Sequence, residues 1–165
     1  DCHKRGGTGP VDEVFEAFAA LAPQVLAVHG NHDELAAPKA LPKNTQILDG
    51  QVRNTAGLRV GGVSGIIGNP SRHQRRDEEA FLAVMESATA RQPHLMLLHQ
   101  GPEDMERRRR GDPGVTLSLQ TGYAGLTVFG HTHWDWPWLI PLGDGQALNV
   151  DGRVVVLLRG DHVSG

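Results

Sequence analysis

Two histidines with one residue between them lie at the end of an apolar run in the segment VFGHTHWDWPW, residues 128–138. In an extended strand, side chains two positions apart point the same way, so His131 and His133 would direct both imidazole rings at one point. Neutral imidazoles are common metal ligands, and two that converge indicate a metal site. Other parts of the chain must then supply the remaining ligands.

Three further segments place polar side chains at the head of a glycine-rich loop or after an apolar run. These side chains are Asp1, Asn31, His32, Asp33 and His99. In α/β folds the ends of the strands carry functional groups, because the rigid sheet positions loop residues that solvent still reaches. Carboxylate, amide oxygen and imidazole ligands together suit Mn, Fe or Zn rather than Ca or Mg.

The order of these residues resembles the pattern of the calcineurin-like metallophosphoesterases. The family pattern is Asp-x-His, Gly-Asp, Gly-Asn-His-Asp/Glu, His and Gly-His-x-His. Four of its five blocks occur here in that order, within the first 133 residues. The second block also shows the frequent Arg-Gly pair as Arg5-Gly6, although Lys4 stands where an aspartate is common. The first block, Asp-x-His, is absent.

The resemblance implies that these side chains bind two divalent metal ions. Asp1 would bridge both ions, and His133 would belong to the first site. The second site would be completed by Asn31, His99 and His131. Manganese is the favoured metal, with iron, zinc and nickel as alternatives. The first site is incomplete in this sequence because its Asp-x-His block is absent.

The resemblance also implies a phosphoesterase reaction. Two divalent ions about 3.5–4 Å apart activate a shared water and hold the phosphoryl oxygens during in-line attack. His32 would contact the phosphate and stabilise charge or protonate the leaving group, and Asp33 would orient His32. We therefore expect hydrolysis of a phosphodiester or phosphomonoester, with a small nucleotide-like substrate favoured.

A non-catalytic protein with the same fold is the alternative. Such a metal-binding or scaffold protein would have lost the first metal site. The presence of His32 argues against this alternative, because a scaffold does not need a phosphate-contacting histidine. A different metallohydrolase chemistry is disfavoured, since the cysteine or acidic ligand set that would indicate it does not occur.

Hydrophobic periodicity predicts alternating helices and strands. Helices are expected at 11–21 and 74–90, and strands at 24–30, 94–102 and 126–133. Turn residues predict consecutive hairpins within 47–65 and a closing hairpin around Asp151-Gly152 within 146–160. We expect one domain over residues 1–165. The resemblance implies an α/β four-layer sandwich of two mixed sheets flanked by helices, with the first strand missing.

The start of the chain at Asp1 leads to a further expectation. A sandwich without its first strand would leave backbone donors and acceptors unpaired, which folded domains rarely tolerate. We therefore expect a natural upstream segment of roughly 20–40 residues that carries an Asp-x-His. His3 is the nearby side chain that would otherwise compensate, whereas Cys2 is expected to be an ordinary loop residue.

Composition argues against several classes of binding partner. The net charge of −3 argues against a dedicated nucleic-acid binder, which usually presents a basic face. A single cysteine excludes an internal disulfide framework and fits a reducing compartment. No apolar run approaches the length of a membrane span. We expect a cytoplasmic protein with a small phosphoester substrate and no membrane partner.

In two charged segments the basic side chains are offset by acidic ones. Residues 103–113 contain four arginines against four acidic residues, which favours a solvated loop, with one arginine reaching the substrate as the alternative. The segment SRHQRRDEE is balanced in the same way, and His73 within it is expected to be exposed. His29 and His94 flank strands and are expected to be structural.

Three tryptophans alternate along residues 134–138. In an extended segment Trp134, Trp136 and Trp138 would share one face. Packing on the core or a contact between copies of the chain is the favoured interpretation. Stacking against a nucleobase or an aromatic leaving group is the alternative.

Overall fold

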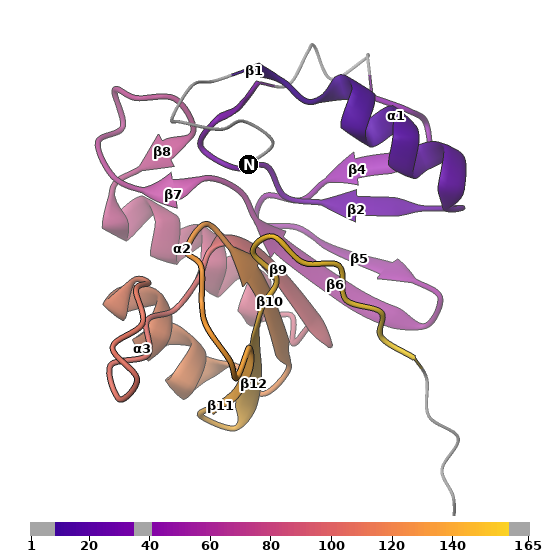
Figure 1. Ribbon diagram of the computed structural model, residues 1–165. Coiled ribbons are helices and arrows are strands. Elements are labelled where there is room, and N and C mark those ends of the chain that lie inside the picture. The colour runs from indigo at the N-terminus through magenta and orange to yellow at the C-terminus, as the bar shows by residue number, and fades with distance from the viewer. Residues whose placement is uncertain (1–8, 35–40, 159–165) are drawn as a thin grey trace, which may run out of the picture.

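The computed structural model describes residues 9–34 and 41–158, and its largest element is a six-stranded mixed sheet (Figure 1). The strand order is β11-β12-β10-β9-β6-β5. Neighbours among β6, β9, β10 and β12 pair in parallel, and β5 and β11 flank them antiparallel. The strands are β5 (Val52–Thr55), β6 (Leu58–Val63), β9 (Leu95–Gln100), β10 (Leu126–Gly130), β11 (Leu139–Leu142) and β12 (Gly145–Asn149).

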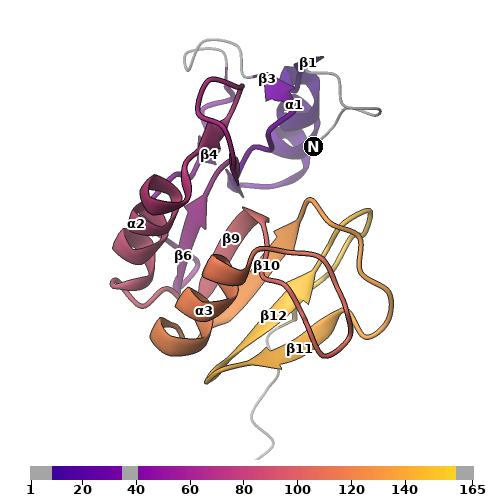
Figure 2. The ribbon, with the colours of Figure 1, turned by 90° about the vertical axis from the view of Figure 1, so that its left-hand side faces the viewer.

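Helices α2 (Glu78–Thr89) and α3 (Pro113–Gly122) cover one face of this sheet (Figure 2). Asp77 caps α2 by accepting the N–H of Ala80 at 2.8 Å, so the helix begins later than the predicted residue 74. Asp112 caps α3 in the same way through the N–H of Val115 at 3.0 Å. Helix α3 was not predicted from the sequence, because its two glycines give it little intrinsic helix propensity.

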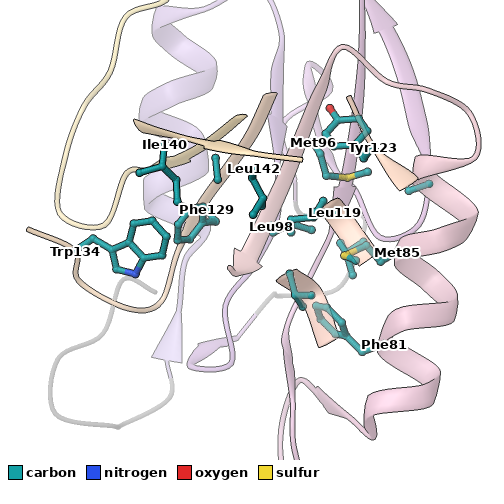
Figure 3. Packing of buried hydrophobic residues seen from close by; sticks show 14 residues of the cluster. Phe81, Met85, Met96, Leu98, Leu119, Tyr123, Phe129, Trp134, Ile140 and Leu142 are labelled. Carbon is teal, nitrogen blue, oxygen red and sulfur yellow. The ribbon is translucent and has the colours of Figure 1, made fainter. Parts of the chain in front are cut away.

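The main core lies between the sheet and these two helices (Figure 3). Met96 and Leu98 from β9 and Phe129 from β10 point toward the helices, because alternate residues of a strand face the same side. Phe81 and Met85 of α2 close the cluster from the other side. Burial contributes roughly 1.5–3 kcal/mol for each such side chain, so this face holds the domain together.

A smaller region lies beside the six-stranded sheet. Helix α1 (Asp12–Leu21) packs on β2 (Val25–Ala27), which pairs in parallel with β4 (Thr45–Ile47) (Figure 1). Strand β1 (Gly9–Pro10) pairs with β3 (Asp33–Glu34).

The two regions meet closely at a glycine of β6. A Cβ atom on Gly62 would lie 2.7 Å from Leu48 and 2.9 Å from Val28, so only glycine lets these chains approach. The α/β class and the mixed sheet of the predicted fold are confirmed. In the described part of the chain, the two-stranded β2–β4 sheet with α1 stands beside the large sheet.

The connection from β6 to α2 carries one more strand pair. Strand β7 (Ile66–Ile67) pairs in parallel with β8 (Arg75–Arg76). Arg76 makes an ion pair with Asp49, which follows β4. This connection therefore fastens the small region to the large sheet near the ends of their strands.

Two of the predicted hairpins are wrong. The Ala56-Gly57 turn does join β5 and β6, with φ angles of 49° and 80° as a type I′ turn requires. Asp49-Gly50 instead carries the chain from one sheet to the other, because β4 pairs with β2 and not with β5. The last hairpin turns at Gly143-Asp144 between β11 and β12, and residues 153–158 form no strand.

The helices of the described residues are α1, α2 and α3. None of them in the described ranges has the length and apolar character required to cross a bilayer.

Candidate metal centre

The carboxyl ends of β9 and β10 place two histidines side by side. His99 is the fifth residue of β9, and His131 follows β10 directly. Because the two strands are parallel neighbours, their carboxyl ends lie at the same edge of the sheet. The ring centroids of His99 and His131 are 4.9 Å apart, with the planes tilted by 59°. These two predicted ligands are therefore brought together.

Asn31 reaches the same point from the smaller region. It lies in the turn between β2 and β3, with 4% of its surface exposed, against 5% for His99. The Asn31 Oδ1 and His99 Nε2 atoms are 3.3 Å apart. Two ligands each about 2.0–2.2 Å from one tetrahedral ion would be separated by roughly that distance. The arrangement of amide oxygen and imidazole nitrogen therefore fits a shared metal ion.

The His99 ring is buried and the His131 ring is partly open to solvent, and desolvation lowers the pKa of both, which favours the neutral form that metals bind. Desolvation lowers the pKa of His99 to about 4. The pKa of His131 is also lowered to about 4, chiefly by desolvation. Neither ring needs to lose a proton at neutral pH before it coordinates a metal.

His32 and Asp33 line the same turn. His32 is half-buried and near enough to lower the pKa of His99 and His131 by its charge. The buried Asp33 carboxylate accepts the N–H of Gly30 at 2.7 Å, which tightens the turn that carries Asn31. The predicted orientation of His32 by Asp33 stays a prediction.

His133 does not follow the extended geometry expected of it. His131 has a φ of 65°, in the left-handed region, so the chain bends where a strand was predicted. The prediction that an extended segment aims both rings at one point is therefore wrong. His133 contacts Asp151 instead, with 3.2 Å between Nδ1 and Oδ2, and its side chain is 62% exposed.

The remaining predicted ligand lies outside the described residues. Asp1 belongs to this part of the chain, as do Cys2 and His3. Within the described ranges, no three side chains of His, Cys, Asp or Glu gather closely enough for a metal ion. The described centre thus consists of two imidazoles and the Asn31 amide.

Asp151 is a further candidate residue of this centre, which the sequence patterns did not single out. It lines the same hollow as His99 and His131 and holds His133. The pair Asp151-Gly152 was interpreted as a hairpin turn. The signal that singled out the other candidates applies here too, because Asp151 is a carboxylate shortly after the buried strand β12.

The tryptophans do not share one face. Trp134 is fully buried and packs edge-on against Phe129, with ring centroids 4.8 Å apart (Figure 3). Trp136 and Trp138 are exposed and form a separate T-shaped pair with centroids 5.4 Å apart. Core packing, one of the expectations, is thus confirmed for Trp134 alone.

Three other histidines have local structural contacts. The backbone N–H of His29 donates to Ser64 Oγ at 3.2 Å, and His94 Nδ1 accepts the N–H of Arg59 at 3.1 Å. His73 is exposed as predicted, and its Nε2 lies 2.9 Å from the carbonyl oxygen of Asp33.

Comparison with known proteins supports the fold. The chain is similar to the crystal structure of TT1561 of Thermus thermophilus, with a TM-score of 0.53 and 17% sequence identity. The match covers 68% of this chain and 52% of TT1561, so the chain spans about half the length of that protein. At this identity the similarity shows a shared α/β fold alone. No protein-family model matches the sequence, and no curated protein is significantly similar to it.

Proposed function

We propose that the chain is a metal-dependent phosphoesterase. The observation that carries this proposal is the convergence of His99 and His131, at the carboxyl ends of neighbouring strands, with Asn31 from the turn after β2. The two rings are neutral at physiological pH, and the amide oxygen adds a third ligand. Half-buried His32 lies beside them, where a proton donor for a leaving group is needed.

The residues divide into ligands and a proton-transfer group. Bound divalent ions would supply an activated water and charge compensation for the phosphoryl oxygens. His99 and His131 offer ring nitrogens, and Asn31 offers its Oδ1 atom. His32 holds the proton that the departing alkoxide needs, and Asp33 fixes the turn that positions His32.

Manganese is the metal we propose, with iron, zinc and nickel as alternatives. A set of imidazole nitrogens with an amide oxygen suits these ions better than Ca or Mg. Two ions are proposed, with Asp1 as the bridging ligand and His133 in the first site. In the described residues, His133 is paired with Asp151 at the rim of the same hollow.

We further propose a small phosphodiester or phosphomonoester as substrate, in a reducing cytoplasmic setting. The single cysteine supports that compartment. The net charge of −3 supports a small substrate over a nucleic-acid polymer. Self-association would involve the exposed pair Trp136 and Trp138 rather than buried Trp134.

A non-catalytic metal-binding protein is the second candidate. The observation that favours it is the small number of ligands, since the described residues bring two imidazoles and one amide together. Such a set holds one ion and not a two-ion catalytic centre.

The test combines metal analysis with an activity panel. The full chain is stripped of metal, reloaded with Mn, Fe, Zn or Ni, and assayed on phosphomonoesters and phosphodiesters. We expect metal-dependent hydrolysis, and we expect His131→Ala to lose both bound metal and turnover. Firm metal binding without any hydrolysis would support the scaffold candidate. Failure to bind metal in every case would refute both.

A further inference from the structure

The four consecutive arginines at 107–110 divide into two pairs with different surroundings. The carboxylate of Asp104 is almost fully buried. Its Oδ2 atom lies 3.2 Å from Arg107 Nη1 and 3.7 Å from Arg109 Nη1. Glu106 Oε2 also lies 3.8 Å from Arg107 Nη1, so two carboxylates offset the charges of these two guanidinium groups. Arg107 and Arg109 are therefore structural, as the expectation of a balanced loop requires.

The loop that carries these arginines is fastened to the segment after β10. Arg109 donates to the carbonyl oxygen of Pro137 at 2.7 Å and lies 5.0 Å above the Trp134 ring. The carbonyl oxygen of Arg110 accepts from Trp134 Nε1 at 2.9 Å and from Thr132 Oγ1 at 3.0 Å. These contacts hold the connection between β9 and α3 against the segment that follows β10. Figure 2 shows this connection running from β9 to α3.

Arg108 and Arg110 are exposed, and unlike Arg107 and Arg109 they make no ion pair with Asp104. Within residues 9–34 and 41–158, no ion pair or side-chain hydrogen bond joins either guanidinium group. Both side chains line one hollow, and His131 and Gln100 form another part of its wall. The described lining contains one acid, Glu103, so the two uncompensated guanidinium groups give the hollow an excess of positive charge.

We infer that Arg108 and Arg110 form an anion subsite that binds a second phosphoryl group of the substrate. The inference rests on the proposed function of the neighbouring centre, which would hold the scissile phosphate near His131. Guanidinium groups bind phosphate through paired, charge-assisted hydrogen bonds. The substrates are then organic phosphates with two phosphoryl groups on one small molecule.

The small extent of the uncompensated positive charge favours a small-molecule ligand over a nucleic-acid polymer. A nucleic-acid surface usually presents a basic stripe across many residues. Here Arg107 and Arg109 are paired with acidic side chains, and the uncompensated pair lies at one short stretch of the loop, where it lines the hollow beside His131. The hollow thus matches one phosphoryl group rather than a long phosphate backbone.

The first test is calorimetric titration of inorganic pyrophosphate into the metal-stripped full chain. We expect saturable binding that weakens at least tenfold in the Arg108→Ala/Arg110→Ala variant, because each charge-assisted hydrogen bond contributes substantially. The Arg108→Lys/Arg110→Lys variant keeps both charges and should recover part of the affinity. Binding that is equal in the wild type and the double alanine variant, or absent from the wild type, would overturn the inference.

Two control variants each remove an arginine that does not line the hollow beside His131. Arg107→Ala removes the same charge from the same loop, but its side chain is already paired with Asp104. Arg91→Ala removes an exposed arginine that lies just beyond the end of α2 and outside the loop that carries residues 107–110. Both should bind pyrophosphate within about threefold of the wild type. An equal loss in all variants would show a general charge effect and would contradict a local subsite.

The metal-free titration also separates this inference from the proposed function. Arginine-dependent binding of pyrophosphate by a chain that hydrolyses no phosphoester would overturn the function and leave the subsite. With active metal-loaded protein, the mono- and bisphosphates of 1,3-propanediol form a matched pair. The double alanine variant should lower kcat/KM at least tenfold for the bisphosphate and little for the monophosphate. Equal effects on both would overturn the subsite alone.

Discussion

One histidine lies directly before strand β9 and another near its carboxyl end, and the two differ in burial and in their contacts. His94 precedes the strand, is exposed, and accepts the N–H of Arg59 at 3.1 Å. His99 lies near the other end, is buried, and faces Asn31 and the His131 ring. Burial lowers the pKa of His99 to about 4. The same side chain thus serves as a local structural partner at one end and as a candidate ligand at the other.

The difference reflects how the two edges of the sheet are built. At the amino ends the connections are tightly packed. A Cβ atom on Gly125 would overlap the Tyr123 hydroxyl and lie 2.8 Å from the carbonyl oxygen of Pro93. At the carboxyl ends, the turns after β2 and β10 leave a hollow between them, lined in part by His99 and His131. In open α/β sheets, ligands commonly bind outside the carboxyl ends of the strands. This end of the sheet therefore has space for a ligand beside His99 and His131.

The largest effect is expected for substitution of His99, the buried histidine near the carboxyl end of β9. His99→Ala removes a candidate ligand, and we expect metal affinity and turnover to fall more than a hundredfold, because even residues that only support a ligand contribute about 10–100-fold. Measurement of bound manganese and of phosphoester hydrolysis gives both values. Retention of metal by His99→Ala would place the metal elsewhere in the molecule.

A smaller effect is expected for the proton-transfer residue of the open end. His32→Ala should lower kcat by about a hundredfold while metal content stays near that of the wild type, because general acids typically contribute at least that much. Steady-state kinetics and metal analysis on the same preparation test this prediction. A parallel loss of metal would show that His32 is a ligand.

A change at the packed end should affect stability and leave the centre intact. Gly125→Ala introduces a Cβ atom that Tyr123 and Pro93 cannot accommodate, and overpacking of this kind costs about 1–3 kcal/mol. Gly122→Ala is the matched control, because nothing lies within 4 Å of its added Cβ. Urea denaturation measures both variants. Loss of metal in folded Gly125→Ala would show that the two ends are not independent.

The smallest effect is expected for the histidine of the packed end. His94→Ala removes one exposed hydrogen bond to the N–H of Arg59, so the free energy of unfolding should fall by about 0.5–1.5 kcal/mol at most. Metal content and turnover should equal those of the wild type. A clear fall in either would remove the distinction between the two ends of β9.

The sequence could predict the site residues that depend on strand ends. Polar residues after apolar runs led to the expectation that Asn31, His99 and His131 lie close together, and the structure does bring these side chains together. For His99 and His131 the reason is that parallel neighbouring strands bring their carboxyl ends to one edge. The bend at His131 could not be predicted, since hydrophobic periodicity carries no information on the φ angle of a single residue. The geometry expected for His133 failed for this reason.

Turns and one helix were harder to predict than the strands. The chain contains Asp-Gly at 49–50, 144–145 and 151–152, and each pair is a hairpin signal. The hairpin β11–β12 forms because its strands extend the large sheet, and that tertiary partner is invisible in a local window. Helix α3 depends on its Asp112 cap and on packing of Val115 and Leu119 more than on helix propensity.

The left-handed backbone of His131 has a consequence for engineering of the chain. A residue other than glycine in this region carries about 1–3 kcal/mol of strain, and glycine would relieve it. Variants selected only for heat resistance would therefore be expected to accumulate glycine at position 131. Such a population would gain thermal tolerance and lose a candidate ligand. Selection for stability would thus favour glycine at position 131, whereas selection for metal binding would favour histidine.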